Sequence, residues 1–395
     1  MTNSINRPWG RLRHLAIGLA LSGVAVISAA QEVVKLGELD AISGPLATYG
    51  WMSHQGIKMA VDEINSAGGF EVAGKKYKLS LTALDNRGQP QEAVIQFKQL
   101  LDSNHNFIFG PFLTNIFNAI EPLAKQASGR VLLMGGATSM HAAIQKSGNE
   151  HLLRTWNWDA GEEGYGKHMV AYMKSLGVKK VAMLIQNDAF GRVLYDIYHP
   201  LFTAQGIQLI VERFEPGTRD YTAVLAKLAA EKPDYLFPGY TDAALNDIFR
   251  QATENNFFRK FFLVRGSMQA AMRYKDQVDD VVAYAHKYFE EAEKTEPKVQ
   301  RFVAAYKAHY KRDFPYDQAP LCSSSCYDHV YMLVEAMKLA QTVSDLPRIR
   351  KALLGMTYRG LWTIKYDANG EAIFEGDIVR LRRGGAVTVT KIGAR

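Results

Sequence analysis

The sequence predicts an α/β protein built on parallel sheets, and three observations carry this prediction. Short apolar runs alternate with segments of helical periodicity along the chain. Several of these runs, such as VAMLI and FFLV, are continuously apolar, as expected for strands whose sheet is covered by helices on both faces. The alternation occurs twice, from Val33 to about Met134 and again from about Val181 to Val264. We therefore expect two three-layer α/β/α lobes.

The strands of the two series are expected at the short apolar runs. They are Val33–Leu39, Leu79–Leu84, Phe107–Phe109, Val131–Met134, Val181–Ile185, Ile207–Val211, Tyr235–Phe237 and Phe261–Val264. The segments between them have helical spacing, as Ile57, Ala60, Val61 and Ile64 illustrate with their i, i+3, i+4, i+7 pattern. Each strand followed by a helix and a further strand makes one right-handed parallel unit.

The order of elements changes after Tyr288. Helices are expected at Pro297–Tyr310, Tyr316–Ala340 and Leu346–Leu354. Strand-like Leu361–Tyr366 and Ala372–Arg382 then flank Asn369-Gly370, the dipeptide typical of a tight hairpin turn. A calcium loop is the alternative for this Asp- and Asn-containing segment, but the remaining oxygen ligands of such a loop are missing.

Composition narrows the function. The chain has 395 residues, of which 47% are apolar and 22% charged, so it has material for two cores and is not a disordered, collagen-like or disulfide-rich chain. Its net charge of +7 is mild and spread along the chain, with three of the arginines in the first thirty residues. We therefore expect no nucleic-acid partner.

The first thirty residues have the layout of a secretory signal peptide. A basic stretch, Met1–His14, precedes the apolar run Leu15–Ile27, and Ser28-Ala29-Ala30 supplies small residues for cleavage after Ala30. The run is shorter than a permanent membrane anchor, and no cysteine follows it for lipid attachment. The alternative is a buried N-terminal helix. An exported protein without an anchor is expected in the periplasm.

No motif supports a cofactor, a metal or catalysis. The turn Ile42–Gly50 is neither a dinucleotide fingerprint nor a phosphate-binding loop, and no residues stand at metal-ligand spacing. Cys322 and Cys326 could pair in an oxidising compartment, although one helical turn would strain the bridge. A Cys nucleophile with His329 lacks an orienting group and an oxyanion site. Two small packed helix residues are the simpler interpretation.

Two glycine-containing turns are the candidate ligand contacts. Gly110–Thr114 follows the strand Phe107–Phe109, and Gly135–Ser139 follows Val131–Met134. In open parallel sheets ligands bind beyond the carboxyl ends of the strands. Hydroxyl side chains and free backbone N–H groups at helix starts form anion sites there. Each turn alone is also explained as a helix cap, but the two together predict a site for a carboxylate or similar small anion.

An ordered series of segments resembles the periplasmic solute-binding proteins of the leucine/isoleucine/valine type. The segments are SGPLATYG, GIKMAVDEINSAGGF, FGPFLT, HLLRTWNWDAGEEGYG, KKVAMLIQNDAFGR, RDYTAVLAKLAAEKPDYLFPGY, CYDHVYMLVEAM and YRGLWTIKYDANGE, and together they cover Gln31–Arg395. The resemblance implies a type I periplasmic binding protein fold, with two α/β lobes joined by three crossover strands. It also implies a cleft that closes on one small ligand, delivery to the permease of an ABC importer, and a monomer.

The resemblance also implies lobe boundaries. Residues 31–154 plus 288–358 would form the N-terminal lobe, and 155–287 plus 359–395 the C-terminal lobe. The three crossovers would lie near Arg154–Asn157, Ala285–Tyr288 and Arg359–Lys365.

Three residues match the family's carboxylate site. Thr114 matches the hydroxyl residue that holds the ligand carboxylate in the family. Gly136 and Thr138 match residues that donate backbone N–H and hydroxyl hydrogen bonds to the same group. The resemblance therefore assigns the expected anion site to the turns that follow the third and fourth expected strands.

Other matches concern the body of the ligand. Tyr49 matches an aromatic residue of the pocket, Tyr240 matches a tyrosine at the ligand, and Phe190 stands where the amino-acid binders have a tyrosine. Ordinary packing is the alternative for all three. The amino-acid binders hold the ligand ammonium with an acid after a second-lobe strand, whereas this chain has Arg265 in that stretch. An acid elsewhere, such as Asp242, would restore amino-acid binding.

This departure changes the expected ligand. A buried ammonium without a carboxylate partner is costly, and Arg265 would favour a second acidic or carbonyl group. Aromatic surface is available nearby from Trp51, Phe112, Trp156 and Trp158. We therefore expect a small carboxylate with an apolar or aromatic body, with a branched-chain amino acid as the alternative.

The expected function is capture of this ligand for import, without covalent chemistry and without a cofactor. One alternative is a sensor that uses the same fold to report ligand occupancy to a regulator. Another is an exported hydrolase that uses Cys322 or an unrecognised pair of acids, for which no nucleophile and base are readable.

Overall fold

The computed structural model describes residues 32–137, 139–156, 164–239, 242–264, 271, 273–285, 289–315, 320–382 and 385–392. The expected signal peptide, residues 1–30, lies outside this part of the chain. No helix of the described ranges combines the length and the apolar character that a membrane crossing requires.

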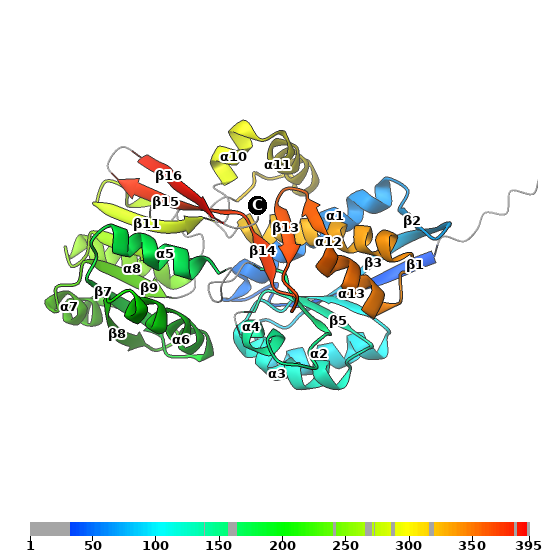
Figure 1. Cartoon of the computed structure of the whole chain (residues 1–395), viewed down its shortest axis with the longest axis horizontal. Coiled ribbons are helices and arrows are strands. Elements are labelled where there is room, and N and C mark those ends of the chain that lie inside the picture. The colour runs from blue at the N-terminus through cyan, green and yellow to red at the C-terminus, as the bar shows by residue number, and fades with distance from the viewer. Residues whose placement is uncertain are drawn as a thin grey trace, which may run out of the picture. The chain divides into compact units, whose positions relative to one another are not determined.

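The first half of the chain forms a six-stranded sheet in the order β2-β3-β1-β4-β5-β6. Its strands β1, β2, β3 and β5 are labelled in Figure 1. Its strands are β1 (Glu32–Asp40), β2 (Phe70–Val72), β3 (Lys75–Asp85), β4 (Phe107–Phe109), β5 (Leu132–Gly135) and β6 (Leu152–Arg154). All pairs are parallel except the edge pair β2–β3. The four strands expected in this half are confirmed to within a few residues.

Helices cover both faces of this sheet, because alternate strand residues point to opposite sides. On β4 the side chains of Phe107 and Phe109 belong to one core cluster, and Ile108 belongs to another. The first cluster contains residues of α1 (Ala47–Ser66), α11 (Pro297–Tyr310), α12 (Pro320–Ala340) and α13 (Leu346–Gly355). The second contains residues of α2 (Pro90–Asp102), α3 (Thr114–Gln126) and α4 (Met140–Ile144). The lobe therefore has the expected three layers.

The second lobe is built on a seven-stranded sheet in the order β16-β15-β11-β10-β9-β7-β8. Its strands are β7 (Lys180–Gln186), β8 (Gln208–Phe214), β9 (Tyr235–Gly239), β10 (Lys260–Leu263), β11 (Asp280–Ala285), β15 (Gly376–Arg382) and β16 (Gly385–Ile392). The four strands expected in this half, β7 to β10, are parallel, and β11 adds a fifth parallel strand that was not expected. The strands β15 and β16 add an antiparallel edge.

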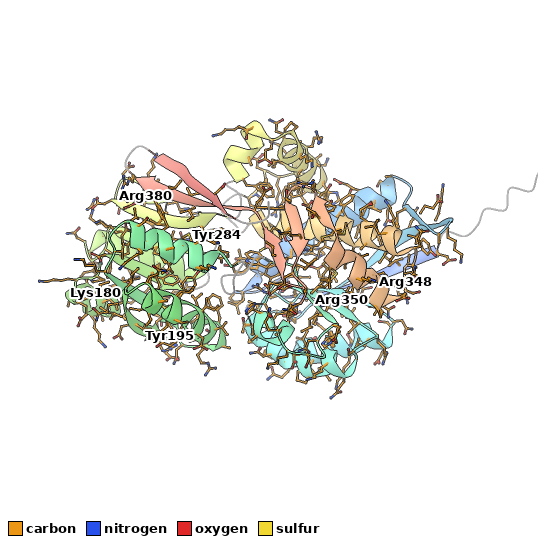
Figure 2. The ribbon with its side chains drawn as sticks, viewed as in Figure 1. Lys180, Tyr195, Tyr284, Arg348, Arg350 and Arg380 are labelled. Carbon is orange, nitrogen blue, oxygen red and sulfur yellow. The ribbon has the colours of Figure 1, made fainter. Side chains whose placement is uncertain are left out.

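The second sheet is also covered on both faces. One cluster joins Ala182 and Leu184 of β7 to α7 (Thr222–Ala230) and α8 (Asp242–Glu254), and the other joins Met183 to α5 (Tyr165–Ser175) and α6 (Ala189–Ala204). Arg380 of β15, labelled in Figure 2, donates hydrogen bonds from Nε and Nη2 to the carboxylate of Asp280 on β11. This ion pair ties the antiparallel edge to the parallel part of the sheet.

The boundary of the C-terminal lobe differs from the expected one. Residues 357–374 form a separate three-stranded sheet of β12 (Thr357–Arg359), β13 (Thr363–Tyr366) and β14 (Ala372–Phe374). Trp362, which is 1% exposed, packs in the core cluster of the first lobe. Assigning the segment from residue 359 onward to the second lobe is therefore wrong as far as Phe374.

The third crossing shifts accordingly. The chain leaves the first lobe after Phe374 and joins the second sheet at Gly376, so the crossing lies at Glu375 and not at Arg359–Lys365. The first two crossings, expected near Arg154–Asn157 and Ala285–Tyr288, run in part through residues outside the described ranges and stay predictions.

The expected hairpin turn is confirmed. The strands β13 and β14 pair in antiparallel register on either side of Asn369 and Gly370. One oxygen of Asp367, Oδ1, accepts hydrogen bonds from the backbone N–H groups of Asn369, Gly370 and Glu371. Gly370 has φ +103°, which L-residues rarely adopt. The Asp367 carboxylate thus stabilises the turn by accepting hydrogen bonds from its backbone N–H groups.

Candidate ligand-binding site

Neighbouring strands of the first sheet deliver three turns to one edge. Since β1, β4 and β5 are parallel neighbours, their carboxyl ends meet there. The turn after β1 leads to Tyr49 in α1, the turn after β4 carries Phe112 and Thr114, and the turn after β5 carries Gly136. Residues separated by more than eighty positions are thereby brought to one place.

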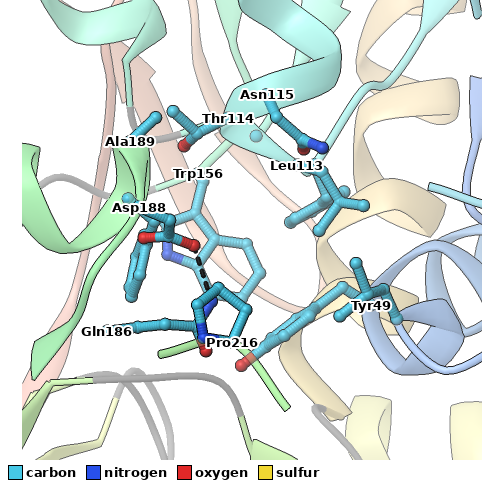
Figure 3. Close-up of a pocket in the computed structure, with 13 residues that line it drawn as sticks. Tyr49, Leu113, Thr114, Asn115, Trp156, Gln186, Asp188, Ala189 and Pro216 are labelled. Carbon is cyan, nitrogen blue, oxygen red and sulfur yellow. Dashed lines mark hydrogen bonds between the residues drawn. The ribbon is translucent and has the colours of Figure 1, made fainter. Parts of the chain in front are cut away.

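These turns line a cavity of about 300 Å³ that residues of the second lobe complete (Figure 3). Its lining residues are Leu46, Tyr49, Phe112, Leu113, Thr114, Asn115, Gly136, Trp156, Gln186, Asp188, Ala189, Phe190 and Pro216. The volume lies at the lower end of the range for small-molecule sites. The lining is mainly apolar, with a few polar groups from each lobe.

Three aromatic rings form a continuous wall. The Tyr49 and Phe112 rings stack at 6.3 Å between centroids with 11° between their planes. Trp156 meets Phe112 edge to face at 5.1 Å and Tyr49 at 6.5 Å. Phe190 of the second lobe adds a further ring to the lining. Such an aromatic wall can pack against a flat apolar or aromatic ligand.

The N-terminus of α3 supplies the polar end of the first lobe. Thr114 begins this 13-residue helix, no side chain caps it at Leu113, and no acid lies in its first turn. The first N–H groups of any helix lack intrahelical acceptors, and the helix dipole makes this end positive. Thr114 is 6% exposed, and among the described residues its hydroxyl has no hydrogen-bond partner. This end of the cavity therefore favours an anion.

Gly136 contributes space. Its N–H and that of Ala137 both donate to the carbonyl of Pro111, at 3.1 Å each, so this amide is already engaged. A methyl group at Gly136 would lie 2.5 Å from Cε1 of Phe112. The glycine thus lets the Phe112 ring lie against the backbone. In this structure the Gly136 N–H donates to the Pro111 carbonyl and not into the cavity, unlike the N–H donation to a ligand that was expected.

The second lobe contributes an acid that the sequence analysis did not single out. Asp188 lies at the N-terminal cap of α6, where its Oδ1 accepts from the N–H of Gly191 at 2.8 Å. Its Oδ2 accepts from Nε2 of Gln186 at 2.6 Å, the bond drawn in Figure 3. The Asp-Ala-Phe-Gly sequence is an N-cap signal that follows a parallel strand, and this combination could have identified Asp188 as a candidate.

A buried acid supports the aromatic wall from behind. Asp40 is 2% exposed, and its Oδ1 accepts from the backbone N–H of Phe112 at 3.2 Å and of Ala41 at 3.0 Å. Burial raises the pKa of this carboxyl to about 7. The protonation state of Asp40 is therefore coupled to the backbone that carries a pocket ring.

A buried arginine contacts the backbone of Trp156, another residue of the aromatic wall. Arg154, at 0% exposed, donates to Oε1 of Glu371 at 2.6 Å. It also donates to the carbonyl oxygens of Ala137 at 3.1 Å and of Trp156 at 3.3 Å. One guanidinium thus joins the turn after β5, the tryptophan of the pocket and the β13–β14 hairpin.

The structure brings four of the seven predicted site residues to this cavity. Tyr49, Thr114, Gly136 and Phe190 line it. The other three, Thr138, Tyr240 and Arg265, lie outside the described residues, as does Trp158. Ligand contact stays a prediction for all seven. Seven further lining residues were not predicted from the sequence: Leu46, Leu113, Asn115, Gln186, Asp188, Ala189 and Pro216.

The two cysteines are not among the residues that line the cavity. Cys322 and Cys326 are buried in α12, and no disulfide joins them. Burial raises the pKa of the Cys326 thiol, and burial lowers the pKa of His329 to about 4. Nδ1 of His329 lies 2.7 Å from the carbonyl of Ser325, the residue four positions earlier in the helix. The arrangement is that of packed helix residues.

Curated relatives cover different shares of the chain. The Leu/Ile/Val-binding protein BraC3 of Rhizobium johnstonii is 28% identical over 220 residues, which is 55% of this chain and 58% of the relative. The leucine-, isoleucine-, valine-, threonine- and alanine-binding protein of Pseudomonas aeruginosa is 22% identical over 88% of this chain and 89% of its own length.

Solved structures share the fold, and a family model matches nearly the whole chain. A leucine-binding protein from Thermotoga maritima aligns with a TM-score of 0.74 at 22% identity, over 91% of this chain and 98% of its own. A solute-binding protein of an ABC transporter from R. palustris, in complex with benzoate, also has a TM-score of 0.74, at 16% identity over 92% and 97% of the two chains. Residues 33–386 match the model described as periplasmic binding protein. The chain therefore belongs to the periplasmic binding protein family and has its type I fold of two α/β lobes.

Proposed function

We propose that this protein is the substrate-binding component of an ABC importer and captures a small aromatic or apolar carboxylate. In this proposal residues 1–30 direct export to the periplasm, and the folded protein presents its bound ligand to a permease in the inner membrane. The protein performs no covalent chemistry on the ligand.

The main support for this proposal is that one cavity contains both an aromatic wall and a helix N-terminus without a side-chain cap. The rings of Tyr49, Phe112 and Trp156 offer apolar surface. The hydroxyl of Thr114, which has no hydrogen-bond partner among the described residues, lies at the positive end of α3. A carboxylate at this end would accept from the Thr114 hydroxyl and from first-turn N–H groups. The body of the ligand would then lie against the rings.

The proposed mechanism is a shift between conformations. The cavity takes residues from both lobes, so a ligand that contacts both stabilises the conformation in which they approach. A permease that recognises this conformation receives only loaded protein. The benzoate complex of the R. palustris solute-binding protein supports an aromatic acid as the class of ligand.

Titration calorimetry tests the ligand class. Purified protein, unfolded and refolded to release any resident molecule, is titrated with benzoate, cyclohexanecarboxylate and leucine. We expect saturable binding of at least one of the two acids and no heat from leucine. Binding of leucine alone would contradict the proposal and would assign the protein to amino-acid uptake.

Amino-acid binding is the second candidate, because the curated relatives are named for leucine, isoleucine and valine and because Asp188 lines the cavity. Its carboxylate would have to hold the ligand ammonium. The same titration separates the two candidates.

A sensor role would use the same binding step. Genes for a permease and an ATPase beside this one would favour import over sensing.

A further inference from the structure

We infer that Asp188 selects, within the proposed class of ligands, an aromatic acid that carries a ring hydroxyl, whose hydrogen it accepts. This inference rests on the proposed function. It concerns the end of the cavity that the second lobe forms, whereas the carboxylate end belongs to the first lobe.

Asp188 is a hydrogen-bond acceptor in the lining of a mainly apolar cavity. A carboxylate has about four lone-pair positions and no hydrogen to donate. Two of these positions are used, by the N–H of Gly191 at 2.8 Å and by Nε2 of Gln186 at 2.6 Å. Within the described part of the chain no Lys, Arg or His lies within 4.0 Å of its oxygens. The carboxylate thus retains capacity that only a hydrogen-bond donor can satisfy.

The electrostatics favour a neutral donor at this position. The two hydrogen bonds and the N-terminus of α6, which Asp188 caps, offset part of its negative charge. The N-terminus of α3 also lines the cavity, and helices α3 and α6 contact one another. The two positive helix ends weaken the attraction of Asp188 for an ammonium, whereas they do not oppose a neutral hydroxyl. A second carboxylate at the same place would face Asp188 and be excluded.

Orientation follows from the difference between the two helix ends. The N-terminus of α3 has no side-chain cap, and that of α6 is capped by its own acid. An anionic group is therefore stabilised at Thr114 and destabilised at Asp188. A ligand with a carboxylate at one end and a hydroxyl elsewhere on its ring satisfies both ends together.

The test compares benzoate with its hydroxylated forms. Dissociation constants for benzoate, 3-hydroxybenzoate and 4-hydroxybenzoate are measured by calorimetry on the wild-type protein, Asp188→Ser and Asp188→Asn. Serine and asparagine both cap helices, so both variants retain the start of α6. Asp345→Asn is the matched control, because Asp345 caps α13 by accepting from Arg348 N–H and does not line the cavity.

In the wild type we expect at least one hydroxybenzoate to bind about tenfold or more tightly than benzoate, as a hydrogen bond to a charged group would give. The preference should vanish in Asp188→Ser, shrink in Asp188→Asn and persist in Asp345→Asn. Benzoate itself should bind Asp345→Asn as tightly as the wild type.

Two results would overturn the inference while leaving the proposed function intact. One is equal affinity for benzoate and both hydroxybenzoates, and the other is a hydroxyl preference that survives in Asp188→Ser. If phenylalanine bound more tightly than all three acids and lost its affinity in Asp188→Ser, the residue would hold an ammonium instead. Failure of every aromatic acid to bind would remove the proposed function, and this inference with it.

Discussion

Replacing Arg154 with methionine should destabilise the protein strongly, because this arginine is buried and ion-paired. The change leaves Glu371, whose side chain is 8% exposed, without its cationic partner at 2.6 Å. It also removes the donors to the carbonyl oxygens of Ala137 and Trp156. Breaking a buried pair from one side costs about 3–5 kcal/mol.

The remaining contacts of Glu371 determine how large the loss of stability in Arg154→Met should be within the range of about 3–5 kcal/mol. Oε2 of Glu371 lies 3.2 Å from Nδ1 of His141, so a partly exposed partner remains for the orphaned acid. We therefore expect a loss near the lower end, about 3 kcal/mol. The double variant Arg154→Met/Glu371→Gln, which removes the orphaned charge, should recover part of the loss.

Urea denaturation followed by circular dichroism measures these free energies by linear extrapolation. The control is Lys58→Met, which breaks an exposed pair four residues apart on α1, at 2.6 Å from Asp62. Such pairs contribute about 0.3–0.5 kcal/mol. A loss below about 1 kcal/mol in Arg154→Met, comparable with the control, would refute the reasoning that burial makes this pair costly to break.

Four further outcomes follow from the site and the core. Thr114→Val should weaken benzoate binding in calorimetry by about tenfold to a hundredfold, since it keeps the shape and deletes the hydroxyl donor, whereas Thr114→Ser should bind nearly normally. Gly136→Ala should weaken binding about tenfold, because its methyl group would lie 2.5 Å from the Phe112 ring and displace it; unchanged affinity would show that the wall adapts. Because burial raises the pKa of Asp40 from 3.8 to about 7, the native state keeps a proton that the unfolded chain loses, so stability falls as pH rises between about 4 and 7. In urea titrations across this window Asp40→Asn should show a smaller fall, and an equal fall would exclude Asp40 as its source. The two buried thiols of α12 should react with a thiol reagent only after denaturation, and rapid labelling of the native protein would contradict their burial.

The layered fold was predictable because each half carries its own periodic signal. Continuously apolar runs such as Val181–Ile185 require cover on both faces, and the structure provides that cover. The hairpin at Asn369-Gly370 was predictable from local turn chemistry alone.

The third crossing was not predictable in the same way. The strand pattern from Leu361 to Tyr366 is equally compatible with either lobe, and its place is decided by the packing of Trp362 against the first-lobe core. Such a choice depends on tertiary contacts between residues far apart in the sequence, which a periodicity argument does not contain.

The part of the site in the first lobe was more predictable from the sequence than the part in the second lobe. Thr114 and Gly136 follow strands of one parallel series, so their meeting at one sheet edge follows from topology. Asp188 has the local signature of an ordinary helix cap, and only the arrangement of the second lobe brings it to the same cavity. The engaged amide of Gly136 also depends on the path of Pro111, which sequence spacing does not reveal.

A crystal structure of the protein grown with benzoate tests the central claim most directly. The account predicts the benzoate carboxylate within hydrogen-bond distance of Thr114 Oγ1 and of first-turn N–H groups of α3, with its ring against Tyr49, Phe112 and Trp156. Benzoate bound in the opposite orientation, or held outside this cavity, would contradict the account.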